Sequence, residues 1–386
     1  MEPIYLDHAA TSPVDKRVLD EMIPYFSMGF GNPSSTHLFG RKAKQALIEA
    51  RARIAHVLGA NANEIILTSG GTEANNLALV GYVRANAHKG KHLITTEIEH
   101  HAILHTIDQL EQEGFSVTRL PVDSDGRISI ADLQDALTDE TIVVSIMFGN
   151  NEVGTLQPIV EIGELVADHQ AVFHTDAVQA AGILSIDVKA LKIDMASISS
   201  HKLNGPKGIG CLYLRENIEI QPMFFGGEQE KRRRAGTENV SGAVGFARAF
   251  ELAAAEYQDR ASKYTYYRSQ FFAIMNEYKI KVTENGSDKY KLPHILNVCF
   301  DGVKTEALLM QLDLLGIAAS GGSACTAGTH LPSHVIEAMY GKESNKVDEA
   351  IRFSFGLGNT DDQLEFAFNA IAKAVRDAHQ QNAFIE

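Results

Sequence analysis

The sequence predicts an α/β protein that is built on a mostly parallel central sheet and completed by a smaller α+β unit. Over the first two thirds of the chain, short apolar runs alternate with helix-like stretches of about ten residues or more. This alternation is typical of βαβ units and a parallel sheet. The last third changes to a long charged helix-like stretch and a few short strand-like runs. These two patterns predict the two parts of the fold.

The strands of the large sheet are expected in six apolar runs, which are Ile65–Thr68, His92–Thr95, Ser116–Leu120, Thr141–Met147, Ala171–Thr175 and Met195–Ser199. Helical spacing begins at Thr72 and recurs over His101–Gly114 and Ile159–His169. In the last third we expect a helix over Glu251–Tyr278, a strand over Ile295–Phe300 and a final helix from Asp361.

The chain length of 386 residues indicates two domains, because single hydrophobic cores rarely grow that large. We expect a large α/β domain at residues 15–255. A small α+β domain would be formed by residues 1–14 and 256–386, and it would carry the loop with Cys325.

Composition excludes several classes of function. The hydrophobic fraction of 45% is that of an ordinary globular protein, and the net charge of −14 argues against direct binding of nucleic acid. No apolar run is long enough to span a membrane, and the first residues lack a signal-peptide pattern. Three sparse cysteines argue against a disulfide framework or a structural zinc site. We therefore expect a cytoplasmic protein.

Polar clusters follow five of the expected strands, at residues Thr68–Asn76, Thr95–Ala102, Gly149–Gly154, His174–Gln179 and Ser199–Gly208. In a parallel sheet, ligands bind beyond the carboxyl ends of the strands. The five clusters therefore predict one shared site at that edge.

The first cluster holds a candidate anion site. Gly71 and Thr72 follow a strand and open a helix, where free backbone N–H groups and the helix dipole favour a phosphate. A plain glycine turn with a threonine cap explains the same residues. The cluster is not a Walker loop, because the Gly-Lys-Ser/Thr sequence is missing.

Lys202 lies after a strand and before a Gly/Pro turn. It is either a solvated surface charge or an amine that forms a Schiff base. Asp176 is either a helix cap or the carboxylate that keeps a pyridinium nitrogen protonated, and Gln179 could reach a ring hydroxyl.

Histidines at positions 100, 101 and 105 raise the question of a metal site. No His-Glu-x-x-His pattern and no obvious third ligand accompany them, so we expect no metal. His100 could stack on an aromatic cofactor and move protons, whereas a structural role is the better explanation for His105.

Cys325 lies among small residues in GGSACTAGT and is a candidate nucleophile, although a tolerated loop thiol is the alternative. Cys211 and Cys299 lie in apolar runs and are expected to be buried and inert. Arg352 is either a carboxylate clamp or part of a structural salt bridge.

Together these residues resemble the cysteine desulfurases of the class V aminotransferase family, which depend on pyridoxal phosphate. The resemblance runs nearly end to end, and it is carried by YLDHAATSP, GNNEVGTLQP, HTDAVQ, SHKLNGPKG, RRAGTEN, GSACTAG and IRFSFGLGN. The GSACTAG context is similar to the NifS/IscS-like branch. One departure is visible, since Gly321-Gly322 stands where the family usually has Ser-Gly.

The resemblance implies a fold of the type I pyridoxal-phosphate transferases and a homodimer. It implies that Lys202 attaches the cofactor and that Asp176 and Gln179 bind its ring. The remaining residues would have the following roles: His100 stacks on the ring and assists proton transfer; Gly71, Thr72, Ser199, His201 and, from a neighbouring subunit, Thr237 bind the phosphate; Asn151 and Arg352 bind the substrate.

The implied reaction converts L-cysteine to L-alanine and leaves a persulfide on Cys325. The sulfur would pass to an iron–sulfur scaffold protein or a tRNA thiolation enzyme. The alternatives are a selenocysteine lyase, another enzyme of the class V family, or a carrier protein that keeps the fold without catalysis.

Overall fold

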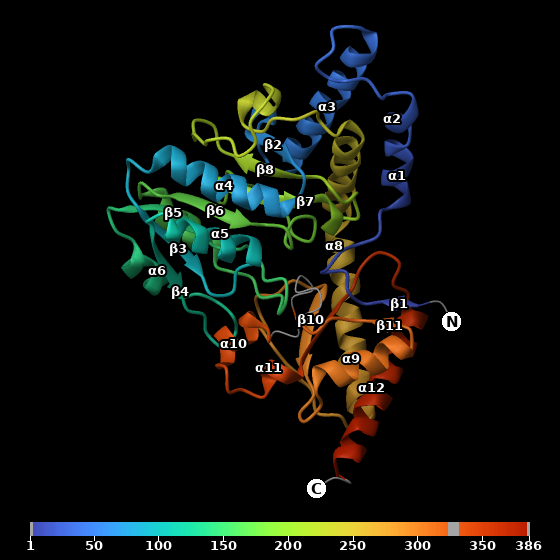
Figure 1. Ribbon diagram of the computed structural model, residues 1–386. Helices are drawn as coiled ribbons and strands as arrows, with labels where there is room; N and C mark the ends of the chain where they lie inside the picture. Colours follow the sequence, from blue (N-terminus) through green and yellow to red (C-terminus); the bar gives the residue numbers. More distant parts are fainter. Residues whose placement is uncertain (1–2, 323–331, 384–386) are drawn as a thin grey trace.

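The computed structural model describes residues 3–322 and 332–383, with side chains to residue 380. Figure 1 shows a large sheet covered by helices in one part of the molecule and two small sheets with their own helices in the other. A long helix, α8 (Val240–Glu277), runs through both parts.

The large sheet has seven strands in the order β2-β8-β7-β6-β5-β3-β4. Their bounds are β2 Ile65–Thr68, β3 His92–Thr96, β4 Ser116–Leu120, β5 Thr141–Ser145, β6 Val172–Asp176, β7 Met195–Ser199 and β8 Gly210–Leu214. Strands β7, β6, β5, β3 and β4 pair in parallel, so the prediction of a mostly parallel sheet is confirmed. The six predicted strands are all present, with ends that differ by at most two residues.

Strand β8 was not among the predicted strands, and it is antiparallel to both β2 and β7. Only ten residues, 200–209, connect β7 to β8. A parallel pairing needs a crossover of a dozen or more residues, so this short connection can only return the chain beside β7 in the opposite direction. The turn at Lys202 is part of this connection.

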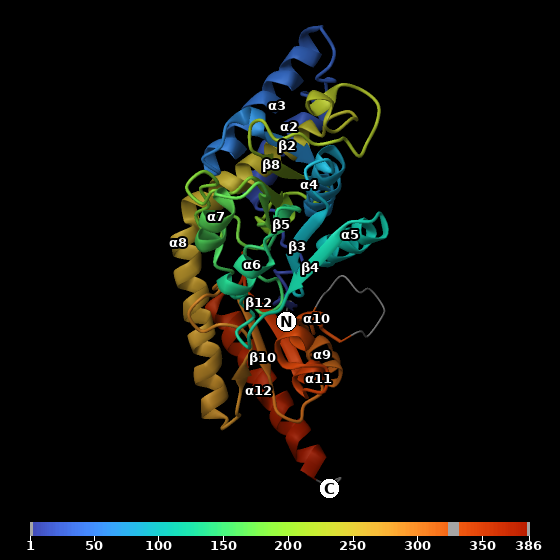
Figure 2. The same cartoon turned by 90° about the vertical axis from the view of Figure 1, so that its left-hand side faces the viewer.

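Helices cover both faces of the large sheet (Figure 2). Along β5, Ile142 and Val143 pack in one core with α4 (Gly71–Asn86) and α5 (His101–Gln112), whereas Val144 packs in the other. The second core includes α3 (Leu38–Val57), α7 (Ile159–Ala167) and the first half of α8. Both faces of the strands are therefore apolar, which explains their continuous apolar runs.

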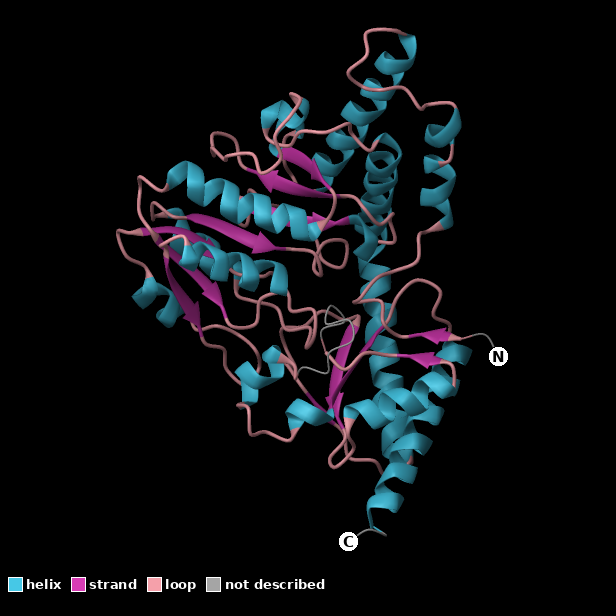
Figure 3. Ribbon diagram, viewed as in Figure 1, coloured by secondary structure: helices cyan, strands magenta, loops and turns pink. Residues whose placement is uncertain are grey.

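The smaller part holds a three-stranded antiparallel sheet in the order β12-β10-β9 and a two-stranded parallel pair, β1-β11 (Figure 3). The bounds are β1 Ile4–Tyr5, β9 Thr283–Glu284, β10 Ile295–Cys299, β11 Ile317–Ala318 and β12 Ala350–Ser354. Its core also takes side chains from α9 (Thr305–Leu314) and α12 (Asp361–Ala383).

The remaining helices are short: α1 Lys16–Met22, α2 Pro24–Ser27, α6 Ile130–Ala136, α10 His334–Tyr340, α11 Lys346–Glu349, and the 3₁₀ turns Ala62–Glu64, Ser200–Lys202 and Gln229–Arg232. None of the helices in the described part of the chain combines the length and the apolar character that crossing a membrane requires.

Helix α8 begins eleven residues before the predicted start at Glu251. Its first half is made largely of small and apolar residues, so the charge pattern that indicated the helix is absent there. Phe246 packs in the core of the large sheet and Phe271 in the core of the small part. The predicted domain boundary at residue 255 falls inside this continuous helix, and the division itself stays a prediction.

Candidate active site

Ten of the predicted site residues line one cavity of about 320 Å³ at the carboxyl ends of the strands. They are Gly71, Thr72, His100, Asn151, Asp176, Gln179, Ser199, His201, Lys202 and Arg352. Ala9, Ala10, Asn75, Met147, Gly149 and Val178 complete the lining. Residues as far apart in the sequence as Ala9 and Arg352 therefore meet in one place.

Lys202 ends the 3₁₀ turn that follows β7, and its amine lies against the N-terminal segment. Its Nζ donates hydrogen bonds to the carbonyl oxygen of Ala9 and, at 2.8 Å, to that of Ala10. The neighbouring His201 contacts the hydroxyl of Thr11 through Nδ1 at 3.1 Å. Burial, reinforced by the charge of Lys202, lowers the pKa of His201 to about 4, so this imidazole is neutral at physiological pH.

Asp176 is the last residue of β6, and both of its carboxylate oxygens accept hydrogen bonds. Oδ2 accepts from the side-chain amide of Asn75 at 2.7 Å, and Oδ1 accepts from the backbone N–H of Val178 at 3.0 Å. The carboxylate is thus held in one orientation at the cavity wall. Gln179 donates to the carbonyl oxygen of Ala9 at 2.9 Å, the same atom that Lys202 contacts.

The start of α4 has the backbone geometry that suits an anion. Gly70 has a φ of +155°, and α4 begins at the next residue. A Cβ atom on Gly71 would lie 2.8 Å from Cγ2 of Val178, so the close approach of this backbone to the cavity wall depends on glycine. The first N–H groups of a helix have no partner within it, and the Ser199 and Thr72 side chains line the same cavity.

His100 caps the N-terminus of α5. Its Nδ1 accepts a hydrogen bond from the N–H of Ala102 at 3.1 Å, so in the neutral ring the proton resides on Nε2. The preceding Glu99 is fully buried, and its Oε1 accepts from the Thr96 hydroxyl and from the N–H of Met147. Burial raises the pKa of Glu99 to about 8.

Arg352 enters the cavity from the middle of β12 and is 1% exposed. One terminal nitrogen donates to Asp7 at 2.7 Å and the other to the carbonyl oxygen of Asn151 at 2.8 Å. Its Nε is buried and has no hydrogen-bond partner among the residues that the structure describes. A buried guanidinium with unsatisfied donor capacity can bind a carboxylate.

Two predicted site residues are not in the cavity as described. Thr237 is exposed in the loop before α8 and does not line the cavity, so its contact with a neighbouring subunit stays a prediction. Cys325 lies outside the described residues. The chain on either side of its segment lies near Glu152, whose carboxylate accepts a hydrogen bond from Ser333 and faces Gly322.

This donor set fits pyridoxal phosphate. A glycine-based helix N-terminus suits the phosphate, a buried carboxylate suits the pyridine nitrogen, and an amine at the turn suits the aldehyde. Most of the lining residues follow the ends of β2, β3, β5, β6 and β7, the edge where the polar clusters predicted a shared site, and Arg352 joins them from β12.

Similar known proteins identify the family of this chain. The model of the family described as "Aminotransferase class-V" matches residues 4–366. The putative cysteine desulfurase IscS 1 of Bacillus subtilis is 54% identical over 97% of this chain and 99% of its own length. The cysteine desulfurase IscS of Methanosarcina thermophila is 46% identical over 97% of this chain and 92% of its own.

This chain belongs to the cysteine desulfurases of the class V aminotransferase family. Among solved structures, a NifS-like protein superposes with a TM-score of 0.91 and 34% identity over 97% of this chain and 100% of its own. The structure titled "SspA in complex with cysteine" gives a TM-score of 0.80 and 38% identity over 91% of this chain and 98% of its own. The predicted family and fold are therefore confirmed.

Three residues that supply polar contacts in the site of this desulfurase, Asn75, Ala9 and Ala10, were not predicted from the sequence. Asn75 lies in the polar cluster that was singled out, three residues after Thr72 and thus on the same helix face, so helical spacing could have found it. Ala9 and Ala10 contribute only backbone carbonyls. No side-chain signal marks a backbone acceptor.

Three histidines of the desulfurase, His101, His105 and His334, pack together. His101 lies 4.7 Å from His334 and 5.2 Å from His105, measured between ring centroids. Within residues 3–322 and 332–383, no group of histidine, cysteine and acidic side chains has the arrangement that would hold a metal ion. Cys211 and Cys299 are both buried, as predicted.

Proposed function

We propose that this desulfurase binds pyridoxal phosphate through Lys202, converts L-cysteine to L-alanine and receives the sulfur as a persulfide on Cys325. The observation that supports this most is the meeting of Lys202, Asp176 and Arg352 in one cavity. An amine, a fixed carboxylate and a buried guanidinium match the aldehyde, the ring nitrogen and the substrate carboxylate.

The phosphate of the cofactor would lie at the N-terminus of α4, with Gly71, Thr72, Ser199 and His201 around it. Asp176 would hold the ring nitrogen and Gln179 the ring oxygen. When bound, the cofactor withdraws electrons from the α-carbon of the substrate. His100 lines the cavity and is expected to stack on the ring.

Arg352 and Asn151 would orient the substrate carboxylate. The amine of Lys202 would take the α-proton and return a proton to the product carbon. The thiolate of Cys325 attacks the sulfur of the substrate, so that one S–S bond forms and one C–S bond breaks. The electrons of the C–S bond remain on carbon, which gains a proton, and the products are alanine and the enzyme persulfide.

The persulfide sulfur would then pass to an acceptor thiol on an iron–sulfur scaffold protein or a tRNA thiolation enzyme. We also propose a homodimer in which Thr237 reaches the neighbouring subunit. Large apolar side chains around α2 and the start of α3 are exposed, among them Met28 at 72% and Phe30 at 64%, which supports a subunit contact there. A cytoplasmic location stays a prediction from the sequence.

A paired assay tests the proposal. The visible spectrum is recorded first, and then the release of sulfide and alanine from L-cysteine with a reductant, for the wild type and for Cys325→Ala. We expect a yellow wild type that makes both products and a yellow but inactive variant. Equal sulfide release without Cys325 would overturn the persulfide step, and a preference for selenocysteine over cysteine would indicate a lyase.

A further inference from the structure

Asn204 lies two residues after Lys202 and has a left-handed backbone, with a φ of +62°. It is 5% exposed, and all of its polar groups are used. Its N–H donates to the Ser12 hydroxyl at 3.0 Å, and its carbonyl oxygen accepts from the N–H of Asp15 at 2.9 Å. Its side-chain amide donates to the carbonyl oxygen of Pro13 at 3.0 Å. Asn204 is therefore bonded to three residues of one short segment.

That segment, residues 9–15, also forms one wall of the active site. The carbonyl oxygens of Ala9 and Ala10 accept hydrogen bonds from the Lys202 amine, and Thr11 contacts His201. The position of the segment thus sets where the acceptors of the Lys202 amine lie. Since these acceptors are backbone atoms, their position depends on whatever fixes the backbone.

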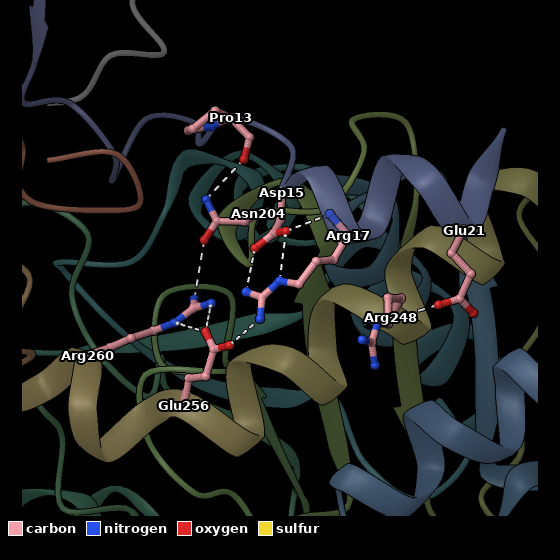
Figure 4. Close-up of polar contacts among 8 residues, drawn as sticks. All are labelled: Pro13, Asp15, Arg17, Glu21, Asn204, Arg248, Glu256 and Arg260. Atoms are coloured by element: carbon pink, nitrogen blue, oxygen red, sulfur yellow. Dashed lines mark hydrogen bonds and ion pairs between the residues drawn. The ribbon is translucent and has the colours of Figure 1, made fainter.

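The side chain of Asn204 is itself held by α8 (Figure 4). Its Oδ1 accepts from Arg260 at 3.3 Å, and Arg260 also binds Glu256 at 2.8 Å. The contacts continue from Glu256 to Arg17 at 2.6 Å and from Arg17 to Asp15 at 2.7 Å. They return to Asn204 through the Asp15 N–H, so they form a closed ring that links the Lys202 turn, the N-terminal segment and α8.

We infer that Asn204 is a positioning residue for the Lys202 site, an inference that rests on the proposed role of Lys202 as the cofactor lysine. Asparagine tolerates the left-handed backbone that this turn requires, and its side chain can donate to Pro13 while it accepts from Arg260. Glycine would adopt the same backbone conformation but would make no side-chain contacts. The side chain therefore adds the tie between the segment and α8.

The decisive variant is Asn204→Gly, which keeps the left-handed backbone and removes only the contacts to Pro13 and Arg260. Cofactor-free full-length protein is mixed with pyridoxal phosphate, and the rise of visible absorbance and of chromophore circular dichroism is followed. Reduction with borohydride and peptide mapping then identify the attached lysine. We expect attachment at Lys202 to slow roughly 10-fold, because small misplacements of reacting groups cost rate steeply, and the circular dichroism band to change.

Asn217→Gly is the matched control, because Asn217 is also left-handed, with a φ of +71°, but lies exposed in a surface turn. It should attach the cofactor like the wild type. Arg260→Met should slow cofactor attachment in part, as Asn204→Gly does. Arg260→Lys should restore attachment toward the wild-type rate. These two variants also keep the inference testable if Asn204→Gly folds poorly.

Hydrogen exchange on the cofactor-free proteins supplies a readout that needs no cofactor. Amides of residues 9–15 should exchange faster in Asn204→Gly, while those of the large sheet stay as in the wild type. An unchanged attachment rate and unchanged circular dichroism in Asn204→Gly would overturn the inference, as would an equal effect of Asn217→Gly. Attachment of the wild type at a lysine other than Lys202 would instead overturn the proposed function.

Discussion

The side-chain amide of Asn75 donates a hydrogen bond to Oδ2 of Asp176 at 2.7 Å, and both residues are buried. This contact joins α4, whose N-terminus is the proposed phosphate site, to the end of β6, which carries the carboxylate. The two ends of the proposed cofactor site are therefore fixed relative to each other by one hydrogen bond.

Replacing Asn75 by alanine should weaken both the fold and the site. The change leaves a buried carboxylate oxygen without its partner, and such a loss costs about 1–3 kcal/mol. We expect Asn75→Ala to lower the free energy of unfolding by that amount and to weaken binding of pyridoxal phosphate, measured by urea denaturation and by absorbance titration. Asn76→Ala is the control, since Asn76 donates to the Thr72 carbonyl on the exposed side of the helix. Equal cofactor affinity in the two variants would contradict the prediction.

Arg352→Lys should raise the KM for L-cysteine more than it lowers kcat. Lysine keeps the charge, but its single ammonium group cannot replace the forked guanidinium. It cannot contact both Asp7 and the Asn151 carbonyl and still offer a donor to the substrate. Hydrogen bonds to charged groups are strong enough that we expect KM to rise roughly 10- to 100-fold. Steady-state kinetics measures this, with Arg376→Lys on the exposed face of α12 as a control. A fall in kcat at unchanged KM would argue against the substrate-binding role.

Glu99 should make the stability of the protein depend on pH. Burial raises its pKa to about 8 from an ordinary value of 4.5. Between these two values the folded protein keeps a proton that the unfolded chain has lost, so stability should fall as pH rises. For this single group, the free energy of unfolding should fall by roughly 1.4 kcal/mol per pH unit between about pH 4.5 and pH 8. Outside that range the group should add no further change with pH.

The comparison with Glu99→Gln isolates that group, because glutamine cannot ionise and still offers an oxygen to Thr96 and Met147. Urea unfolding at pH 5, 6.5 and 8 should show the wild type losing stability relative to the variant at each step. Two stability profiles that run parallel over this range would mean that Glu99 does not keep its proton in the folded state.

The two buried cysteines should play no part in sulfur transfer. Burial raises the pKa of the Cys211 thiol and of the Cys299 thiol, so neither forms the reactive thiolate readily. In the native protein, iodoacetamide at pH 8 should leave both unmodified, as read by peptide mass spectrometry. Cys299→Ala should still form a persulfide from L-cysteine at the wild-type rate. Its loss in that variant would place the acceptor thiol elsewhere than at Cys325.

Most of the site could be predicted from the sequence because its residues follow apolar strands directly. The carboxyl ends of parallel strands lie at one edge, so the polar residues after β2, β3, β6 and β7 had to meet there. The role of Thr237 was predicted only from the family resemblance. Its predicted contact is with a neighbouring subunit, so a single chain does not contain it. Strand β8 was not predicted, although its apolar run around Cys211 was noted, and its antiparallel direction follows from the ten-residue connection after β7.

The sequence by itself determined the α/β class, six of the seven strands of the large sheet to within two residues, and Lys202, Asp176 and Arg352 as candidate site residues. Hydrophobic periodicity and side-chain chemistry are properties of the amino-acid sequence, so no tertiary structure was needed for these predictions. Only the tertiary structure decided that the carbonyls of Ala9 and Ala10 face Lys202, that Asp7 holds Arg352, and that Asn204 ties the N-terminal segment to α8. These contacts join residues that are 56 to 345 positions apart, and some of them depend on backbone atoms that every residue type carries. The amino-acid pattern does not show which distant residues will meet, and a backbone carbonyl has no side-chain signature. These contacts could therefore be identified only from the tertiary packing.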